Sequence, residues 1–311
     1  MKILLATDGS DTAKATVDYL LAFPLPKTAE FTVVTVLHEV LSSKQIDELS
    51  DEHREAYDRA QAEAEQDAKK LLDEEVGRIR QAGMQATGRI RTGHPAEEIV
   101  GVATELRSDI VAVGSHGHSA AHRFLLGSTS DRVFEYAPCS VLIVKHPAAT
   151  AGVDATALPE QDGKWRILLA FDDSPPARRA IELCQSLPLD GRAELKIVTI
   201  MPLIHMYRQD IRQQLDWIWR EKKSAAESAL KWAAAEIHSR SVDVQTKLIE
   251  GTQVPQDILD IAASDGTDLI VIGHKGRKAL QRFLLGSVTA RIAHHAPCSV
   301  LSVRTCDEPT P

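Results

Sequence analysis

Two stretches of the chain share one spacing of glycines, Gly-x2-Gly-x9-Gly-Ser, which is suited to holding an anion. The first copy spans residues 114–128 and the second spans residues 273–287. Glycines let backbone amides approach a ligand closely, and the final Gly-Ser is expected to open a helix whose N-terminus favours phosphate. Each copy follows an apolar run that is typical of a buried strand. Because two copies of one spaced pattern rarely arise by chance, the pattern predicts two related anion sites.

The repetition extends over two halves of the 311-residue chain. Three further pairs of segments align without gaps, namely 2–10 with 166–174, 31–37 with 195–201, and 137–144 with 296–303. Since a typical domain has about 150 residues, this length indicates two domains. We therefore predict one domain over residues 1–146, a linker over 147–164 that is rich in Ala, Pro and Gly, and a second domain over 165–305.

Short apolar runs alternate with longer amphipathic stretches in both halves, which predicts a parallel sheet covered by helices. We expect strands near 2–7, 31–37, 86–91, 109–113, 139–145, 166–171, 194–201, 243–249, 268–272 and 298–303. We expect helices near 11–22, 44–82, 95–106, 128–136, 175–187, 210–239, 255–264 and 287–295. The predicted fold class is α/β, with two Rossmann-like domains that each contain a five-stranded parallel sheet with helices on both faces. Ligands of such sheets bind beyond the carboxyl ends of the strands at the topological switch point, where Asp8 and the first glycine segment are expected.

Composition argues against several classes of protein. The formal net charge of −8 disfavours binding to nucleic acid or to an anionic membrane surface. Four cysteines without a Cys-x2-Cys pair argue against a disulfide framework or a structural zinc site, and we expect no metal site. No apolar run reaches about 18 residues, so we expect no membrane span. The first residues are too short and too soon charged for a signal peptide, and we expect a cytoplasmic location.

Three features together resemble the universal stress protein family. They are the Asp8-Gly9-Ser10 turn after the first strand, the glycine pattern, and a closing Ala-Pro-Cys-Ser-Val strand. The resemblance covers nearly all of both halves and implies a tandem universal stress protein, and the intact glycine pattern is typical of the ATP-binding branch. It also implies that domains pair along their last strands, 141–144 with 300–303. That pairing would make either a pseudo-dimer within one chain or a homodimer of two chains.

The resemblance assigns roles to individual residues. The phosphates of one nucleotide would be held by Gly114, Gly117, Gly127 and Ser128, and those of a second by Gly273, Gly276, Gly286 and Ser287. The backbone amides of Thr129 and Val288 would add to these two sites. Asp8 and Asp172 would line the adenine-ribose side, and backbone groups of Val36 and Ile200 would meet adenine. Mg²⁺ or Mn²⁺ carried by ATP would lie near the hydroxyl of Ser128 or Ser287.

Some features of the site have two interpretations. Asp8 and Asp172 could instead cap the following helix through Asx-type hydrogen bonds. Asp173 stands where the first half has Gly9, and the adjacent carboxylates could repel a phosphate in the second half. The first loop carries His116, His118, His122 and Arg123, whereas the second carries Lys275, Arg277, Lys278 and Arg282. Because histidine is charged mainly below about pH 6.5, we expect the second half to bind polyphosphate more tightly at neutral pH.

For function, the sequence favours an ATP-binding stress-response protein that senses or regulates, with no catalytic residues and at most weak ATP hydrolysis. The chain has no Gly-x4-Gly-Lys-Ser/Thr segment, which argues against a P-loop NTPase. One alternative is a slow ATPase of the adenine-nucleotide hydrolase type, although that group has a Ser-Gly-Gly-type loop where this chain has Thr-Asp-Gly-Ser at 7–10. A second alternative is a nucleotide-free interaction scaffold that binds a protein or a hydrophobic ligand. Trp217, Trp219 and Trp232 would either pack the second helix of the second half against the sheet or form a partner or dimer surface.

Overall fold

The structure is a computed structural model, and it describes residues 1–39, 41, 43–117, 126–145, 163–202, 209–238, 242–276 and 286–305. Most of the expected linker and the middle of both glycine loops, 118–125 and 277–285, lie outside the described residues.

Ten strands form one continuous sheet in the order β3-β2-β1-β4-β5-β10-β9-β6-β7-β8. The first half supplies β1 (Lys2–Ala6), β2 (Glu30–His38), β3 (Gln85–Gly93), β4 (Ile110–Gly114) and β5 (Ser140–Val144). The second half supplies β6 (Trp165–Ala170), β7 (Ala193–Pro202), β8 (Asp243–Gly251), β9 (Leu269–Gly273) and β10 (Ser299–Val303). Within each half all paired strands are parallel, so the predicted α/β class with two five-stranded parallel sheets is confirmed.

The two halves are joined edge to edge. Strand β10 pairs with β5 in the antiparallel direction, with Leu301 opposite Leu142. This single antiparallel pair turns two five-stranded sheets into one sheet and leaves neither of the two strands as an open edge.

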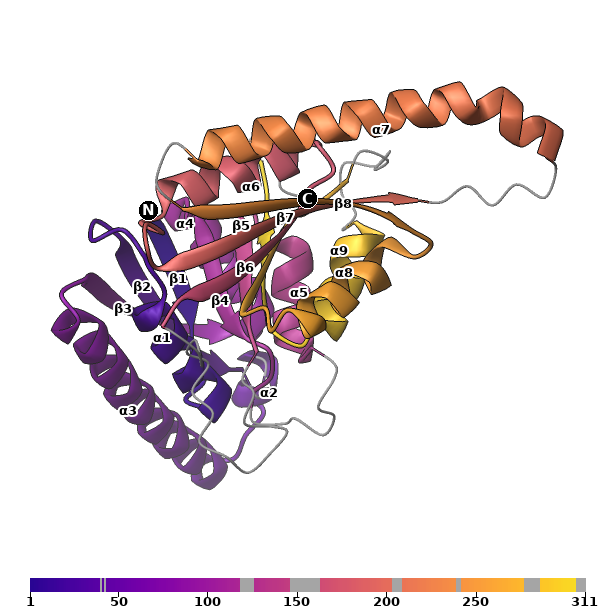
Figure 1. Cartoon of the computed structure of the whole chain (residues 1–311). Helices are drawn as coiled ribbons and strands as arrows, with labels where there is room; N and C mark the ends of the chain where they lie inside the picture. The colour runs from indigo at the N-terminus through magenta and orange to yellow at the C-terminus, as the bar shows by residue number, and fades with distance from the viewer. Residues whose placement is uncertain are drawn as a thin grey trace.

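Helices cover both faces of the sheet (Figure 1). In the first half they are α1 (Asp11–Ala22), α2 (Ser43–Asp47), α3 (Asp51–Gln81), α4 (Pro95–Leu106) and α5 (Ser128–Tyr136). In the second half they are α6 (Pro175–Ser186), α7 (Gln209–His238), α8 (Val254–Ser264) and α9 (Ser287–His295). Helices α1, α3, α6 and α7 pack on one face around a core shared by both halves, while α4, α5, α8 and α9 cover the other face.

One predicted element is wrong in its extent. The single helix expected over 44–82 is two helices, because α2 ends at Asp47 and a new helix begins after Ser50. Ser50 has an extended backbone (φ −66°, ψ 160°), and its side chain accepts a hydrogen bond from the His53 amide to cap α3. A serine N-cap of this kind competes with helix continuation, and the polar composition of the segment hid it.

The core at the joint is aromatic. Tyr19 of α1 and Phe23, the C-cap residue of that helix, both contact the ring of Trp165 edge-on, at centroid distances of 4.9 and 5.0 Å. Since Trp165 begins the first strand of the second half, these contacts hold the two halves together through buried apolar surface. In the described part of the chain, no helix combines enough length with enough apolar character to cross a bilayer.

Candidate functional site

In the first half, β2 and β3 lie on one side of β1, and β4 and β5 lie on the other side. Strand β1 pairs with β2 on one side and with β4 on the other, so the loops after β1 and β4 leave neighbouring strand ends. In the second half β6 lies between β7 and β9 in the same way. The carboxyl ends of the two central strands therefore form a switch point in each half, the usual ligand-binding position in open α/β sheets.

The first residues after β1 form an Asx turn. The Ser10 amide donates to Asp8 Oδ1 at 3.0 Å, and Ser10 in turn caps α1. The second half repeats the turn, with the Ser174 amide donating to Asp172 Oδ1 at 3.1 Å. The helix caps are therefore the serines, while each aspartate uses one carboxylate oxygen to fix the turn.

The other carboxylate oxygen of each aspartate lies against the glycine loop. A Cβ atom built on Gly117 would stand 2.6 Å from Asp8 Oδ2, and one built on Gly276 would stand 2.8 Å from Asp172 Oδ2. A side chain at either glycine would require the aspartate carboxylate or the loop to shift. The structure thus brings Asp8 together with Gly117 and Asp172 together with Gly276, which explains why the second position of each pattern is glycine.

The strand-end glycines allow a close approach of helix and strand. A Cβ atom on Gly114 would lie 3.1 Å from the Thr12 carbonyl oxygen, and one on Gly273 would lie 3.0 Å from the Ala177 amide nitrogen. The first turns of α1 and α6 can therefore pack directly over the strand ends. The Thr12 hydroxyl donates to the His116 carbonyl, which ties the glycine loop to α1.

The last glycine of each pattern closes the loop and begins a helix. The Gly127 amide donates to the Ser115 carbonyl at 2.8 Å, and the Gly286 amide donates to the His274 carbonyl at 3.1 Å. Gly127 and Gly286 are also the N-cap residues of α5 and α9, and neither helix has a side-chain cap. In α1 a serine side chain accepts a hydrogen bond from an amide of the first turn. The first amides of α5 and α9 have no such side-chain acceptor and can donate to a ligand instead.

Two hydroxyl residues of the site were missed from the sequence. Ser130 Oγ donates to the Gly114 carbonyl at 2.6 Å, and Thr289 Oγ1 donates to the Gly273 carbonyl at 2.8 Å. These two hydrogen bonds attach the first turns of α5 and α9 to the ends of β4 and β9. A hydroxyl three residues after the last glycine in both copies was the signal that could have found them.

The adenine-side residues lie on the second strand of each half. Val36 is half-buried on β2 against the face covered by α4 and α5, and Ile200 is half-buried on β7 beside α8. Their backbone contact with a base stays a prediction. Among the described residues, no group of three His, Cys, Asp or Glu side chains is placed to hold a metal ion.

The sequence model of the universal stress protein family matches residues 1–145 and 165–304. The chain belongs to the universal stress protein family. Because the match occurs twice and covers both halves, the protein carries two universal stress protein domains in tandem. As a member of this family the protein has a role in the stress response.

Individual relatives agree with this membership. The chain is 29% identical over 145 residues to the universal stress protein YxiE of Bacillus subtilis, which covers 46% of this chain and 98% of the relative. It is 29% identical over 198 residues to a universal stress protein of Mycolicibacterium smegmatis, covering 63% of this chain and 62% of that protein. The crystal structure of a universal stress protein from Archaeoglobus fulgidus superposes with a TM-score of 0.63 at 22% identity, over 99% of this chain and 97% of the other, and supports the fold.

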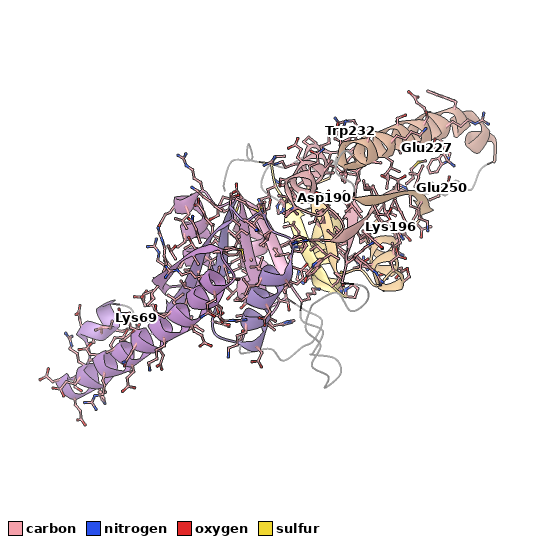
Figure 2. The ribbon with its side chains drawn as sticks, turned by 60° about the vertical axis from the view of Figure 1, so that its left-hand side comes forward. Lys69, Asp190, Lys196, Glu227, Trp232 and Glu250 are labelled. Carbon is pink, nitrogen blue, oxygen red and sulfur yellow. The ribbon has the colours of Figure 1, made fainter. Side chains whose placement is uncertain are left out.

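The two universal stress protein domains differ at the turn that holds the aspartate. Gly9 has φ +76°, and Asp173 adopts the same left-handed conformation with φ +60°. Arg178 Nε donates to Asp173 Oδ1 at 2.8 Å, and the same guanidinium lies 4.7 Å from the centroid of the Trp232 ring. Trp232 belongs to α7, where Figure 2 labels it. The Asp173 carboxylate is therefore paired with a cation, which lowers its repulsion toward a ligand beside Asp172.

The domains also differ in the residues that start the glycine loop. The second domain has buried His274 and buried Lys275, which stand where the first has Ser115 and His116. His274 Nδ1 lies 3.2 Å from Ser302 Oγ. Burial, together with Arg304 and Lys275, lowers the pKa of His274 to about 2, so this imidazole is neutral. The other charged loop residues, His118, His122, Arg123, Arg277, Lys278 and Arg282, lie outside the described residues.

Proposed function

We propose that each domain of this universal stress protein binds one molecule of ATP and that the protein acts in the cytoplasm as a regulator or sensor. Two observations together carry the proposal: an aspartate carboxylate lies against a glycine of the loop, and the helix that follows this loop has no side-chain cap. This arrangement is built twice, from Asp8 and Gly117 in one domain and from Asp172 and Gly276 in the other. It lies at the switch point of both sheets.

The residues present fit an adenine nucleotide. The first amides of α5 and α9 would hold the phosphates, since a helix N-terminus presents N–H groups and a partial positive charge. The hydroxyls of Ser128 and Ser287 would lie beside Mg²⁺ or Mn²⁺ brought by the nucleotide. Asp8 and Asp172 would accept hydrogen bonds from the ribose hydroxyl groups. Because a carboxylate repels a phosphate, the sugar end of the nucleotide suits this position better than the phosphate end.

Regulation would follow from ordering of the glycine loops. A bound polyphosphate would connect the loop after β4 with the first turn of α5, and the loop after β9 with that of α9. Ligand binding of this kind shifts the population of loop conformations, and a partner that recognises one of them would sense the nucleotide.

The test is the identity and amount of nucleotide in the protein as purified. The protein is denatured, the released ligand is separated by chromatography and identified by mass, and its amount is compared with that of the chain. We expect about two ATP per chain, the same number as glycine loops. About one per chain would show that only one domain binds.

Other outcomes would select the alternatives. If no nucleotide is released and Mg-ATP does not raise the thermal unfolding temperature, the proposal is wrong and an interaction scaffold remains. Turnover of ATP faster than about one per minute, which is slow beside the ordinary range of enzymes, would favour the ATPase over the regulator.

A further inference from the structure

The two phosphate-facing helices begin at the candidate nucleotide sites and end at the joint between the domains. Helices α5 and α9 each have nine residues and are therefore about 13 Å long. Their C-termini lie next to the paired strands β5 and β10 that join the domains. The last carbonyl groups of both helices carry partial negative charge, which a cation stabilises.

Each of these C-termini is capped by a cation from the other domain. Lys145 follows the last strand of domain one, and its Nζ donates to the carbonyls of His294 and Ala296 at 3.1 and 2.8 Å, at the end of α9. Arg304 follows the last strand of domain two. Its Nη2 donates to the carbonyls of Phe134 and Glu135 at 3.3 and 2.6 Å, at the end of α5.

The backbone amides of these two cations also donate hydrogen bonds to the opposite domain. The Lys145 amide donates to Ser299 Oγ of domain two at 3.3 Å, and the Arg304 amide donates to Ser140 Oγ of domain one at 3.3 Å. Lys145 and Arg304 occupy equivalent positions, one residue after Val144 and Val303. The arrangement is therefore reciprocal, and both cations are held at two points.

Both cations are also adjacent to the glycine loop of their own domain. The Val144 carbonyl accepts from the Ser115 amide at 2.9 Å, and the Val303 carbonyl accepts from the His274 amide at 2.8 Å. Ser115 and His274 each follow the first glycine of the pattern. The side chains, in contrast, reach the opposite domain.

We propose that Lys145 is a positioning residue for the nucleotide site of domain two and that Arg304 is the positioning residue for the site of domain one. The inference rests on the proposed ATP binding. By fixing the C-terminus of the opposite helix, each cation sets where that helix presents its first amides to the phosphates. It also offsets the partial negative charge at the C-terminus of that helix, which makes an anion at the opposite end more favourable.

The charge of Lys145 is present at neutral pH. Burial lowers the pKa of its amine to about 8. Arg304 keeps its charge at any physiological pH because guanidinium is a far stronger base.

The test uses the crossed direction of the effect in the full chain. Gly117→Ala is used to leave only domain two competent for ATP, and Gly276→Ala to leave only domain one. Mg-ATP affinity is measured by calorimetry in each background, with and without Lys145→Met or Arg304→Met. We expect Lys145→Met to lower the Mg-ATP affinity of domain two by about five- to tenfold and to leave that of domain one unchanged. We expect Arg304→Met to lower the affinity of domain one and to leave that of domain two unchanged.

Conservative and matched variants separate positioning from loss of structure. Lys145→Arg restores a cation and should recover most of the affinity of domain two. Arg80→Met is the control, because Arg80 also donates to a carbonyl, that of Ala86 at 2.8 Å, but within domain one and away from the joint. Arg80→Met should change neither affinity.

The outcomes distinguish the two proposals. Suppose that wild-type protein binds two ATP, and that Lys145→Met lowers the ATP affinity of both domains equally or of domain one alone. The positioning role is then wrong, while ATP binding stands. The same conclusion follows if neither affinity changes. If wild-type protein binds no ATP, the proposed function fails and the positioning role fails with it.

Discussion

The Asp131 carboxylate on α5 lies 3.0 Å from Nε2 of His294 on α9, so these two helices meet directly across the joint between the domains. The equivalent of Asp131 in α9 is Ala290, and the equivalent of His294 in α5 is Glu135. This link therefore has no symmetric counterpart, unlike the exchanged caps of Lys145 and Arg304. The two tandem domains are alike in fold but are not interchangeable at their contact.

We predict that Asp131→Ala lowers the free energy of unfolding by no more than about 1 kcal/mol, because partly exposed ion pairs are weak. Side-chain exposures of 46% for Asp131 and 29% for His294 place the pair in that class. Urea unfolding of the two single variants and the double Asp131→Ala/His294→Ala variant measures the coupling. A coupling well above 1 kcal/mol would show that the pair, and not the backbone caps, holds the helices together.

Gly117→Ala should abolish ATP binding in domain one. The new methyl group would stand 2.6 Å from Asp8 Oδ2, so either the carboxylate or the glycine loop must move. Gly101→Ala is the matched control, since Gly101 lies inside α4 with nothing within 4 Å of the added atom, and alanine there should stabilise the helix by about 0.5–1 kcal/mol. Calorimetric titration of both variants with Mg-ATP checks the difference, and normal binding by Gly117→Ala would argue against this site.

Arg178→Met should weaken ATP binding in domain two by about tenfold, because it removes the guanidinium that pairs with the Asp173 carboxylate next to Asp172. Adding Asp173→Gly to that variant removes the carboxylate and restores the residue that domain one has at φ +76°. The double variant should therefore bind ATP nearly as well as the wild type. If the double variant binds no better than Arg178→Met, the loss comes from packing against Trp232 and not from charge.

The buried imidazole of His274 makes stability depend on pH. Its pKa in the folded protein is about 2, against an ordinary value of 6.5 that applies in the unfolded chain. Below pH 6.5 the unfolded chain therefore binds a proton that the folded protein does not. The contribution of His274 to stability is fully present above pH 6.5 and declines as the pH falls, by up to about 1.4 kcal/mol per pH unit.

Urea unfolding of wild type and His274→Asn at pH 7.5, 6 and 5 tests this prediction. Asparagine can still bond to Ser302 but does not titrate in this range, so the variant should lose stability less steeply on acidification. Parallel curves for the two proteins would mean that other groups control the acid sensitivity.

The local elements of this protein were predictable because they depend on residues close together in the chain. Short apolar runs that alternate with longer amphipathic stretches placed all ten described strands to within two residues of their observed ends. The helix break at Ser50 was missed, since a polar segment gives no periodic signal at which to stop. Repetition of the glycine pattern predicted two equivalent sites.

The contacts that shape each site depended on tertiary structure, because they join residues far apart in sequence. Asp8 reaches the space beside Gly117 only when β1 and β4 are neighbours in the sheet. The sequence predicted no partner for Arg178. In the structure its guanidinium pairs with the carboxylate of Asp173, because the turn at Asp173 brings the two side chains together. The exchange of Lys145 and Arg304 between domains follows from the antiparallel pairing of β5 with β10, which places each strand end beside the opposite helix. Sequence determined which residues could bind a phosphate, and only the packing of the two sheets decided which cations hold the helices that present it.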